Sequence, residues 1–324
     1  MKQEIKWGII GLGKIANKFA EGLAPVENAV LYAVASRDSE NAASFSKKHN
    51  AQVAYASYSQ LMQDENVDVI YIATPHVFHH DLTLDCIRHG KAVLCEKPFA
   101  MDLEEAEAMV KISKKEKVFL MDALWTMFLP HFQFVLKKVN SGELGKVKSL
   151  KADFGFSAEF DKTKRLFNKS LGGGSLLDIG IYPVFFAYSI LGNPSKVIAN
   201  AQFTETGVDA NCDIKFQYDE GVEADLFSTF LERTPTIAEI EMEKGRIILN
   251  TRFHEPTSVT IISEDKEETL DFEMDTNGYF YEADHVTKML QAGKTESDIL
   301  DLEKTLDIMR LLDRIKSEIG LSYK

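Results

Sequence analysis

A glycine-rich turn directly after the first apolar run is the feature that most limits what this chain can fold into. The run spans 6–10, and the turn is Gly11-Leu12-Gly13-Lys14-Ile15-Ala16, a G-x-G-x-x-A pattern that opens a helix. The first glycine permits a tight turn, the second lets a pyrophosphate approach the backbone, and the small alanine allows the helix to pack closely on the strand. Phosphates would rest on the helix N-terminus, where unpaired N–H groups and the helix dipole favour negative charge. The pattern predicts a dinucleotide site, and the alternative is a tight β-α turn without a ligand.

The tip of the second predicted strand indicates which dinucleotide is preferred. This strand, at 29–35, is followed by Ser36, Arg37 and Asp38. A carboxylate at the tip accepts hydrogen bonds from a ribose 2′-OH and repels a 2′-phosphate, whereas an arginine pairs with that phosphate. Arg37 therefore predicts NADP(H). NAD(H) remains possible if Arg37 is only solvated and Asp38 only starts the next helix.

Residues 1–123 alternate short apolar runs with longer amphipathic stretches, which is the pattern of β-α units around a parallel sheet. The runs are continuous and β-branched, as expected for strands that are covered on both faces. We predict an α/β domain with a doubly wound, parallel Rossmann sheet over 1–123, with strands at 6–10, 29–35, 53–55, 67–73, 92–95 and 118–123.

Residues 124–324 predict a second, α+β domain with a large, mostly antiparallel, open sheet. Apolar residues alternate over 211–231, and Asp219-Glu220-Gly221 turns the chain into a hairpin. The apolar stretch 174–192 is interrupted by Asp178 and Pro183, so it is predicted as a buried helix rather than a membrane span. Further strands are expected at 196–204, 237–242, 246–249, 258–263 and 268–272, and helices at 280–291 and 299–319, the last of which could pack back on the first domain.

Charge and cysteine content exclude several classes of protein. The chain of 324 residues has 37 Lys+Arg against 50 Asp+Glu, a formal net charge of −13, which argues against nucleic acid and against an anionic membrane surface as partners. The three cysteines lack C-x-x-C spacing, so neither a disulfide framework nor a zinc site is suggested. We expect a cytoplasmic protein whose partner is a small molecule.

The predicted strand at 92–95 runs directly into Glu96-Lys97-Pro98, at the sheet edge where doubly wound folds bind their ligands. In order, the G-x-G-x-x-A pattern, Thr74-Pro75 with His79, and Glu96-Lys97-Pro98, followed by an α+β half, resemble the glucose-fructose oxidoreductase, inositol dehydrogenase and MocA family. The resemblance covers essentially the whole chain. It implies an NAD(P)-dependent oxidoreductase in which Lys97 is catalytic.

A later stretch, 172–182, is similar, together with Trp125-Thr126, to the branch of the family that contains dimeric dihydrodiol dehydrogenases and NADP-dependent sugar oxidoreductases. It places Tyr182 where many other branches have histidine, one helical turn after Asp178. A phenol with a pKa of about 10 is a poor proton shuttle at pH 7, but a nearby ammonium favours the phenolate. We hypothesise that Tyr182 exchanges the proton with the substrate, that Lys97 tunes it and polarises the substrate oxygen, and that Asp178 orients the substrate or the lysine. The alternative is that Lys97 is itself the acid/base.

The resemblance also implies contacts with cofactor and substrate. His76, His79 and His80 form an H-x-x-H-H cluster, but no Cys or carboxylate spacing completes a metal site, so no metal is predicted. His76 stands where the family commonly has asparagine. The expected cofactor-binding residues are Gly11, Gly13, Lys14, Ile15, Ala16, Ser36, Arg37, Thr74, Pro75, His76, His79, Glu96 and Lys97. The expected substrate-binding residues are Trp125, Phe154, Arg165 and Asp178.

The predicted function is NADP(H)-dependent hydride transfer to or from a CH–OH or C=O group of a sugar, polyol or cyclic trans-diol. An aromatic wall suits any of these, since each presents an apolar face with hydroxyl groups. The alternative is a non-catalytic sensor of the same fold that binds the nucleotide and reports it to a partner protein. Retention of both Lys97 and Tyr182 argues against the sensor. The family further implies a homodimer through the outward face of the C-terminal sheet.

Overall fold

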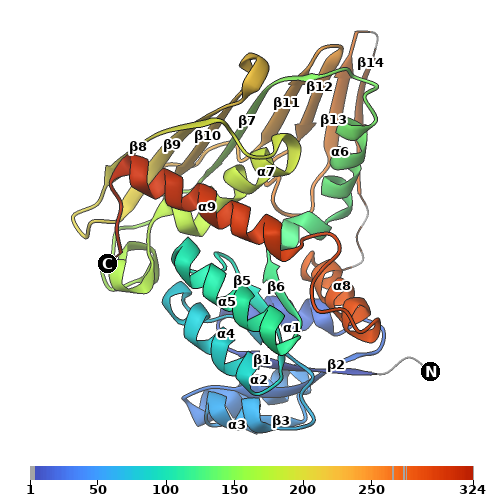
Figure 1. Ribbon diagram of the computed structural model, residues 1–324, viewed down its shortest axis with the longest axis vertical. Helices are drawn as coiled ribbons and strands as arrows, with labels where there is room; N and C mark the ends of the chain where they lie inside the picture. Colours follow the sequence, from blue (N-terminus) through green and yellow to red (C-terminus); the bar gives the residue numbers. More distant parts are fainter. Residues whose placement is uncertain (1–3, 265, 273, 275, 324) are drawn as a thin grey trace. The chain divides into compact units, whose positions relative to one another are not determined.

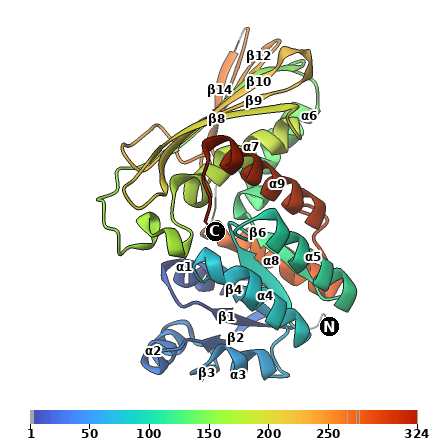
Figure 2. The same cartoon turned by 60° about the vertical axis from the view of Figure 1, so that its left-hand side comes forward.

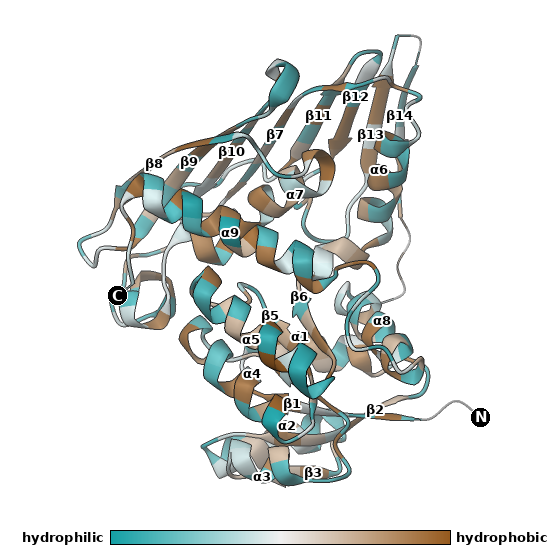
Figure 3. Cartoon of the chain, in the orientation of Figure 1, coloured by the Kyte–Doolittle hydropathy of each residue, from teal (hydrophilic) through white to brown (hydrophobic). Residues whose placement is uncertain are grey.

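The computed structural model describes residues 4–264, 266–272, 274 and 276–323 (Figure 1). The chain forms two compact units. Unit 1 comprises Met1–Phe128 and Met274–Leu306, and unit 2 comprises Leu129–Glu273 and Asp307–Lys324. Both units are built around a sheet, and Figure 3 shows the strands of both sheets largely in the hydrophobic colour.

Unit 1 contains a parallel six-stranded sheet in the order β3-β2-β1-β4-β5-β6. This order reverses direction between β1 and β4, which is the arrangement of a doubly wound dinucleotide-binding sheet. The predicted Rossmann sheet is thereby confirmed. Its strands are β1 (Ile5–Ile10), β2 (Ala29–Ala35), β3 (Val53–Tyr55), β4 (Val69–Ile72), β5 (Ala92–Glu96) and β6 (Leu120–Ala123).

The helices of unit 1 begin where short polar side chains can cap them. Asp38 accepts hydrogen bonds from two backbone N–H groups of the first turn of α2, and Ser57 and Asp102 each cap the helix that follows them. Helix α1 packs against α8, which comes from the distant segment of the unit, and α4 packs against α5. The helices are α1 (Lys14–Leu23), α2 (Ser39–His49), α3 (Tyr58–Gln63), α4 (His79–Arg88), α5 (Leu103–Glu116) and α8 (Tyr279–Gln291).

Unit 2 contains an eight-stranded sheet in the order β14-β13-β12-β11-β7-β10-β9-β8. Every neighbouring pair is antiparallel except β7 with β10, so the predicted large and mostly antiparallel sheet is confirmed. The predicted hairpin corresponds to β9 and β10, whereas the central strand β7 was not predicted. The strands are β7 (Val147–Gly155), β8 (Lys196–Phe203), β9 (Asp209–Gln217), β10 (Glu223–Thr229), β11 (Ala238–Met242), β12 (Gly245–Leu249), β13 (Val259–Ser263) and β14 (Lys266–Leu270).

Helices α6 (Pro130–Asn140) and α7 (Ile181–Leu191) lie on the same face of this sheet in both views (Figures 1 and 2). The stretch 169–191 is apolar and long enough to cross a membrane, but 78% of its most apolar window is buried inside the protein, as predicted for a core helix. Within this stretch, a π-helical turn, Leu176–Gly180, directly precedes α7. Pro183 explains the wider turn, because it lacks the N–H that would bond to the carbonyl of Ile179. The last helix, α9 (Leu302–Ile319), starts in the segment of unit 1 that ends at Leu306 and continues in the segment of unit 2 that starts at Asp307.

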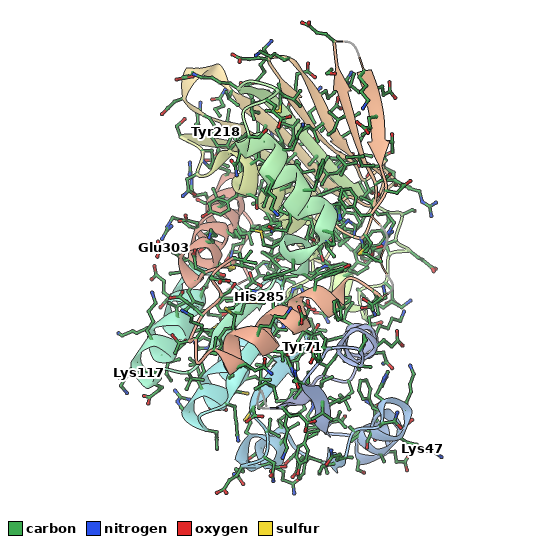
Figure 4. The ribbon with its side chains drawn as sticks, turned by 90° about the vertical axis from the view of Figure 1, so that its right-hand side faces the viewer. Lys47, Tyr71, Lys117, Tyr218, His285 and Glu303 are labelled. Carbon is green, nitrogen blue, oxygen red and sulfur yellow. The ribbon has the colours of Figure 1, made fainter. Side chains whose placement is uncertain are left out.

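Three carboxyl groups are buried in unit 1, where β5 and β6 end. Glu96 closes β5, Asp122 lies on β6 and Glu282 on α8. Glu96 accepts one hydrogen bond from the hydroxyl of Tyr71, which Figure 4 marks beside the ribbon of α8, and one from the N–H of Lys97 at 3.1 Å. Burial, and secondly the charge of Glu96, raises the pKa of both Asp122 and Glu282 well above the ordinary range, although Lys97 lowers that of Asp122. Asp122 and Glu282 are therefore held in the protonated form.

Replacing Glu282 by glutamine should make unit 1 more stable at high pH. A carboxyl group whose pKa is raised by folding contributes stability below its unfolded pKa, and that contribution is lost as the pH rises toward its folded pKa. A tenfold change in proton affinity corresponds to about 1.4 kcal/mol. Between pH 5 and pH 8, the free energy of unfolding of Glu282→Gln should therefore rise relative to that of the wild type by more than about 1 kcal/mol. Urea unfolding at both pH values measures the difference, with the exposed Glu303→Gln as control. Parallel pH profiles of Glu282→Gln and wild type would contradict the expectation.

Candidate active site

The start of α1 in unit 1 has the geometry of a phosphate-binding turn. Gly11 has a φ of +87°, and a Cβ there would lie 2.6 Å from the carbonyl group of Ala73 at the end of β4. Gly13 is the N-cap residue and has open space where a Cβ would be, and Lys14 and Ile15 are exposed while Ala16 is buried. The backbone N–H groups of the first turn can therefore be approached by an anion, as the sequence pattern suggested.

The tip of β2 leaves an arginine exposed. The carboxylate of Asp38 accepts hydrogen bonds from the N–H groups of Glu40 and Asn41 at 3.0 and 3.1 Å, so it is engaged in capping α2. Ser36 is buried, and its hydroxyl accepts a hydrogen bond from the N–H of Asp38. Arg37 is exposed beside them, where its guanidinium can pair with a phosphate.

A buried histidine ties the loops after β4 and β5 together. His79 begins α4 and is fully buried. Its Nε2 lies 2.9 Å from the carbonyl oxygen of Thr74, and its Nδ1 lies 2.9 Å from that of Pro98. His76 is also buried, in a short 3₁₀ turn (His76–Phe78) after Pro75, with its ring 5.9 Å from that of His79. The structure thus brings the predicted residues of these two loops together.

Lys97 follows β5 directly and is half-buried. The peptide bond between Lys97 and Pro98 is cis. The backbone N–H of Lys97 donates a hydrogen bond to the side chain of Glu96, and the charge of Lys97 lowers the pKa of the buried Asp122. The backbone of the residue predicted to be catalytic is thus fixed from within unit 1.

Trp125 was predicted to contact substrate, and it lies in a 3₁₀ turn of unit 1 (Trp125–Phe128). Its ring stacks on that of Tyr279 in α8, with centroids 4.5 Å apart and planes 7° apart. The other predicted substrate residues belong to unit 2, and so does Tyr182. They are Phe154, Arg165 and Asp178.

The helix that carries Asp178 and Tyr182 is anchored by a buried acid that the sequence did not reveal. Asp209, at the start of β9, accepts hydrogen bonds from the hydroxyl of Ser175 at 2.8 Å and from the N–H of Leu176 at 2.6 Å. Burial raises the pKa of Asp209 to about 7, while these hydrogen bonds oppose that increase. Gly174 has a φ of +119° and leaves no room for a Cβ beside Asp209. The start of the helix is therefore fixed on both sides.

Asp178 forms an ion pair with Arg165 of the turn Arg165–Phe167, at 2.8 Å between Nη2 and Oδ1. The side chain of Asp178 is 12% exposed and that of Arg165 35%, so the pair lies at the border between core and solvent. The structure thus brings together these two predicted substrate residues. An arginine held in this way keeps a fixed direction, which a site that orients polar substrates requires.

Tyr182 lies in an aromatic cluster of unit 2. Its ring is 5.8 Å from that of Phe154 and 4.7 Å from that of His254, and Phe154 stacks on His254 at 4.1 Å. His254 is buried and comes from the segment after β12, where no sequence pattern marked it. Within the described part of the chain, no group of three or more His, Cys, Asp or Glu side chains has an arrangement that could hold a metal ion.

Two family models match the chain. Residues 5–123 match the oxidoreductase family with an NAD-binding Rossmann fold, and residues 132–248 match the GFO/IDH/MocA C-terminal domain. Among solved structures, the aldose-aldose oxidoreductase of Caulobacter crescentus has a TM-score of 0.90 at 23% identity, and the 3-ketoreductase KijD10 of Actinomadura kijaniata, in complex with NADP and TDP-benzene, has a TM-score of 0.87 at 24% identity. Each likeness covers 98% of both chains and shows the fold.

Curated relatives are similar over nearly the whole chain. A trans-1,2-dihydrobenzene-1,2-diol dehydrogenase of Xenopus tropicalis is 35% identical, covering 98% of this chain and 99% of the relative. The scyllo-inositol 2-dehydrogenase (NADP(+)) IolU of Bacillus subtilis is 32% identical, covering 98% of both. The order of motifs, the two-sheet fold and these matches agree, and the chain belongs to the GFO/IDH/MocA family of oxidoreductases.

Proposed function

We propose that this protein is an NADP(H)-dependent oxidoreductase that transfers hydride to or from a CH–OH or C=O group of a sugar, polyol or cyclic trans-diol. The observation that carries the proposal is full-length similarity to dehydrogenases named for a cyclic diol and for an inositol, in a chain that keeps the phosphate turn, Lys97 and Tyr182. When bound, the nicotinamide supplies or accepts the hydride.

The residues of unit 1 suit a dinucleotide with a 2′-phosphate. The exposed N–H groups at the start of α1 would hold the pyrophosphate, and Arg37 would hold the 2′-phosphate. The carboxylate of Asp38 would accept hydrogen bonds from the N–H groups that start α2 rather than from a ribose hydroxyl. Thr74, Pro75, His76 and Glu96 would complete the binding site from the loops after β4 and β5.

Tyr182 would donate its hydroxyl proton to the substrate oxygen when a carbonyl is reduced, and would take that proton back in the reverse direction. Lys97 would stabilise the negative charge that develops on the oxygen and on the phenolate. The ion pair of Asp178 with Arg165 would orient the substrate hydroxyl groups, and the rings of Phe154 and His254 would pack on its apolar face.

Screening sugars, diols and diketones with NADPH and NADH should give turnover, and a substrate found in this way allows the acid/base assignment to be tested. Tyr182→Phe should lower kcat by roughly 10²–10⁴-fold. NADPH affinity should be retained, because the phenyl ring preserves the packing on Phe154. Lys97→Met should also lose turnover. If Tyr182→Phe keeps near-full turnover while Lys97→Met loses it, the lysine is the acid/base. Binding of NADPH without turnover of any carbonyl compound would instead favour the sensor.

Arg37→Ala should weaken NADPH binding by roughly 10–100-fold, which corresponds to the loss of a charged hydrogen bond of about 1.5–3 kcal/mol. NADH binding should change little, because NADH has no 2′-phosphate. Fluorescence titration of both cofactors measures this. Lys47→Ala removes the same charge from an exposed position at the other end of α2 and is the control (Figure 4). Equal weakening of NADPH and NADH by Arg37→Ala would refute the assignment.

We also infer that two copies associate through the outward face of the sheet in unit 2. A groove on this face is lined by apolar Ile198, Phe227 and Ile237 and by both signs of charge, with Lys151 and Lys215 beside Asp225 and Glu239. Such a face can be complementary to itself. Light scattering should give a dimer at micromolar concentration, and Phe227→Glu a monomer. Phe160→Glu, the same change at an exposed position outside the groove, should stay dimeric. A monomeric wild type would defeat the inference.

A further inference from the structure

Each ring nitrogen of His79 lies within hydrogen-bond distance of a backbone carbonyl oxygen. Nδ1 and Nε2 each lie 2.9 Å from a backbone carbonyl oxygen, of Pro98 and of Thr74 respectively. A carbonyl oxygen only accepts hydrogen bonds, and a neutral imidazole carries one N–H. Only the doubly protonated ring can donate to both carbonyls. In the neutral ring, one nitrogen lone pair would face a carbonyl oxygen inside the core.

A positive charge on His79 needs compensation inside the protein. His79 is fully buried, and a buried cation is stable only where negative charge or hydrogen bonds compensate it. The two carbonyl dipoles point at the ring, and in the same segment Glu96, two residues before Pro98, accepts hydrogen bonds from the hydroxyl of Tyr71 and the N–H of Lys97. Two hydrogen-bond acceptors are thus in direct contact with the ring, and a buried carboxyl group belongs to the same segment of the chain.

Titratable groups flank this turn on β5, on β6, in the preceding 3₁₀ turn and on α4. From β5, the Cys95 thiol has a pKa that burial raises well above its usual value, and from β6 the pKa of Asp122 is raised in the same way, so both are neutral. His76 faces His79 from the preceding 3₁₀ turn. On α4 itself, His80 is paired with the exposed Asp81.

We propose that His79 is held as a doubly protonated imidazolium and is a positioning residue for Lys97, because it fixes the carbonyl of Pro98, the residue after Lys97, to the loop after β4. This rests on the proposed function insofar as Lys97 is catalytic. Loss of either N–H would release one of the two loops, and with it the backbone next to Lys97.

The protonation can be read directly in the unmodified protein. Long-range ¹H–¹⁵N spectra of histidine-labelled enzyme at pH 7.5, assigned through backbone correlations, should show a proton on both nitrogens of His79. His131 is the internal control. It is buried, its Nε2 contacts the carbonyl of Phe253 at 3.0 Å, its Nδ1 has no hydrogen-bond partner among the described residues, and burial lowers its pKa. It should show one protonated and one bare nitrogen. A bare nitrogen on His79 at pH 7.5 overturns the proposal.

The positioning role is tested by His79→Gln, whose amide can donate to one of the two carbonyls at most. Its kcat should fall at least tenfold, and the alkaline decline of kcat that follows deprotonation of His79 in the wild type should be absent. Wild-type kcat with an unchanged pH profile overturns the positioning role. If no substrate is turned over, the proposed function fails while the NMR result still decides the state of His79. The NMR experiment also does not depend on whether the variant folds.

Discussion

The cofactor-binding part of unit 1 depends on one constraint. The backbones of β1 and β4 approach each other closely at the carboxyl edge of the parallel sheet. A side chain at residue 11 would collide with the carbonyl group of Ala73, and the φ of +87° disfavours any residue with a Cβ. The strand order reverses between these two strands, so the chain leaves them toward opposite faces, and doubly wound sheets bind their ligands at such a point. The turns that start α1 and α4, and the turn that carries Lys97, follow strands that end at this edge.

Both units contain a buried acid that accepts a hydrogen bond from a backbone N–H group of the candidate site. In each, the backbone that carries a side chain of the candidate site is held by a buried acid where a strand ends or a helix begins. In unit 1, Glu96 holds the N–H of Lys97, and in unit 2, Asp209 holds the first N–H of the helix that carries Tyr182. Burial raises the pKa of Asp209, and the hydrogen bonds that it accepts oppose that increase. These acids fix backbone geometry from the protein interior.

The sequence predicted those parts of the fold and site that depend on neighbours in the chain. The phosphate turn, the capped helices and the hairpin are each formed by one contiguous segment, so their residue types are visible locally. The central strand β7 (Val147–Gly155) was missed, although Leu150, Ala152 and Phe154 alternate with charged residues, and its partners β10 and β11 lie far away in the chain. Asp209, His254 and Glu282 were missed as well. Each is a single polar residue whose partners are distant in sequence, and nothing local shows that α8, in the segment 274–306, packs on α1.

The buried acids also explain how an acidic protein can suit a polyanionic cofactor. The net charge of −13 is spread over the whole chain, and at physiological ionic strength charges more than about 8 Å away are largely screened. What matters is the charge near the carboxyl edge of the sheet. There the raised pKa values leave Asp122 and Glu282 uncharged, and the carboxylate of Glu96 accepts a hydrogen bond from the backbone N–H of Lys97. The local field is then set by the start of α1 and by Arg37, both of which attract phosphate.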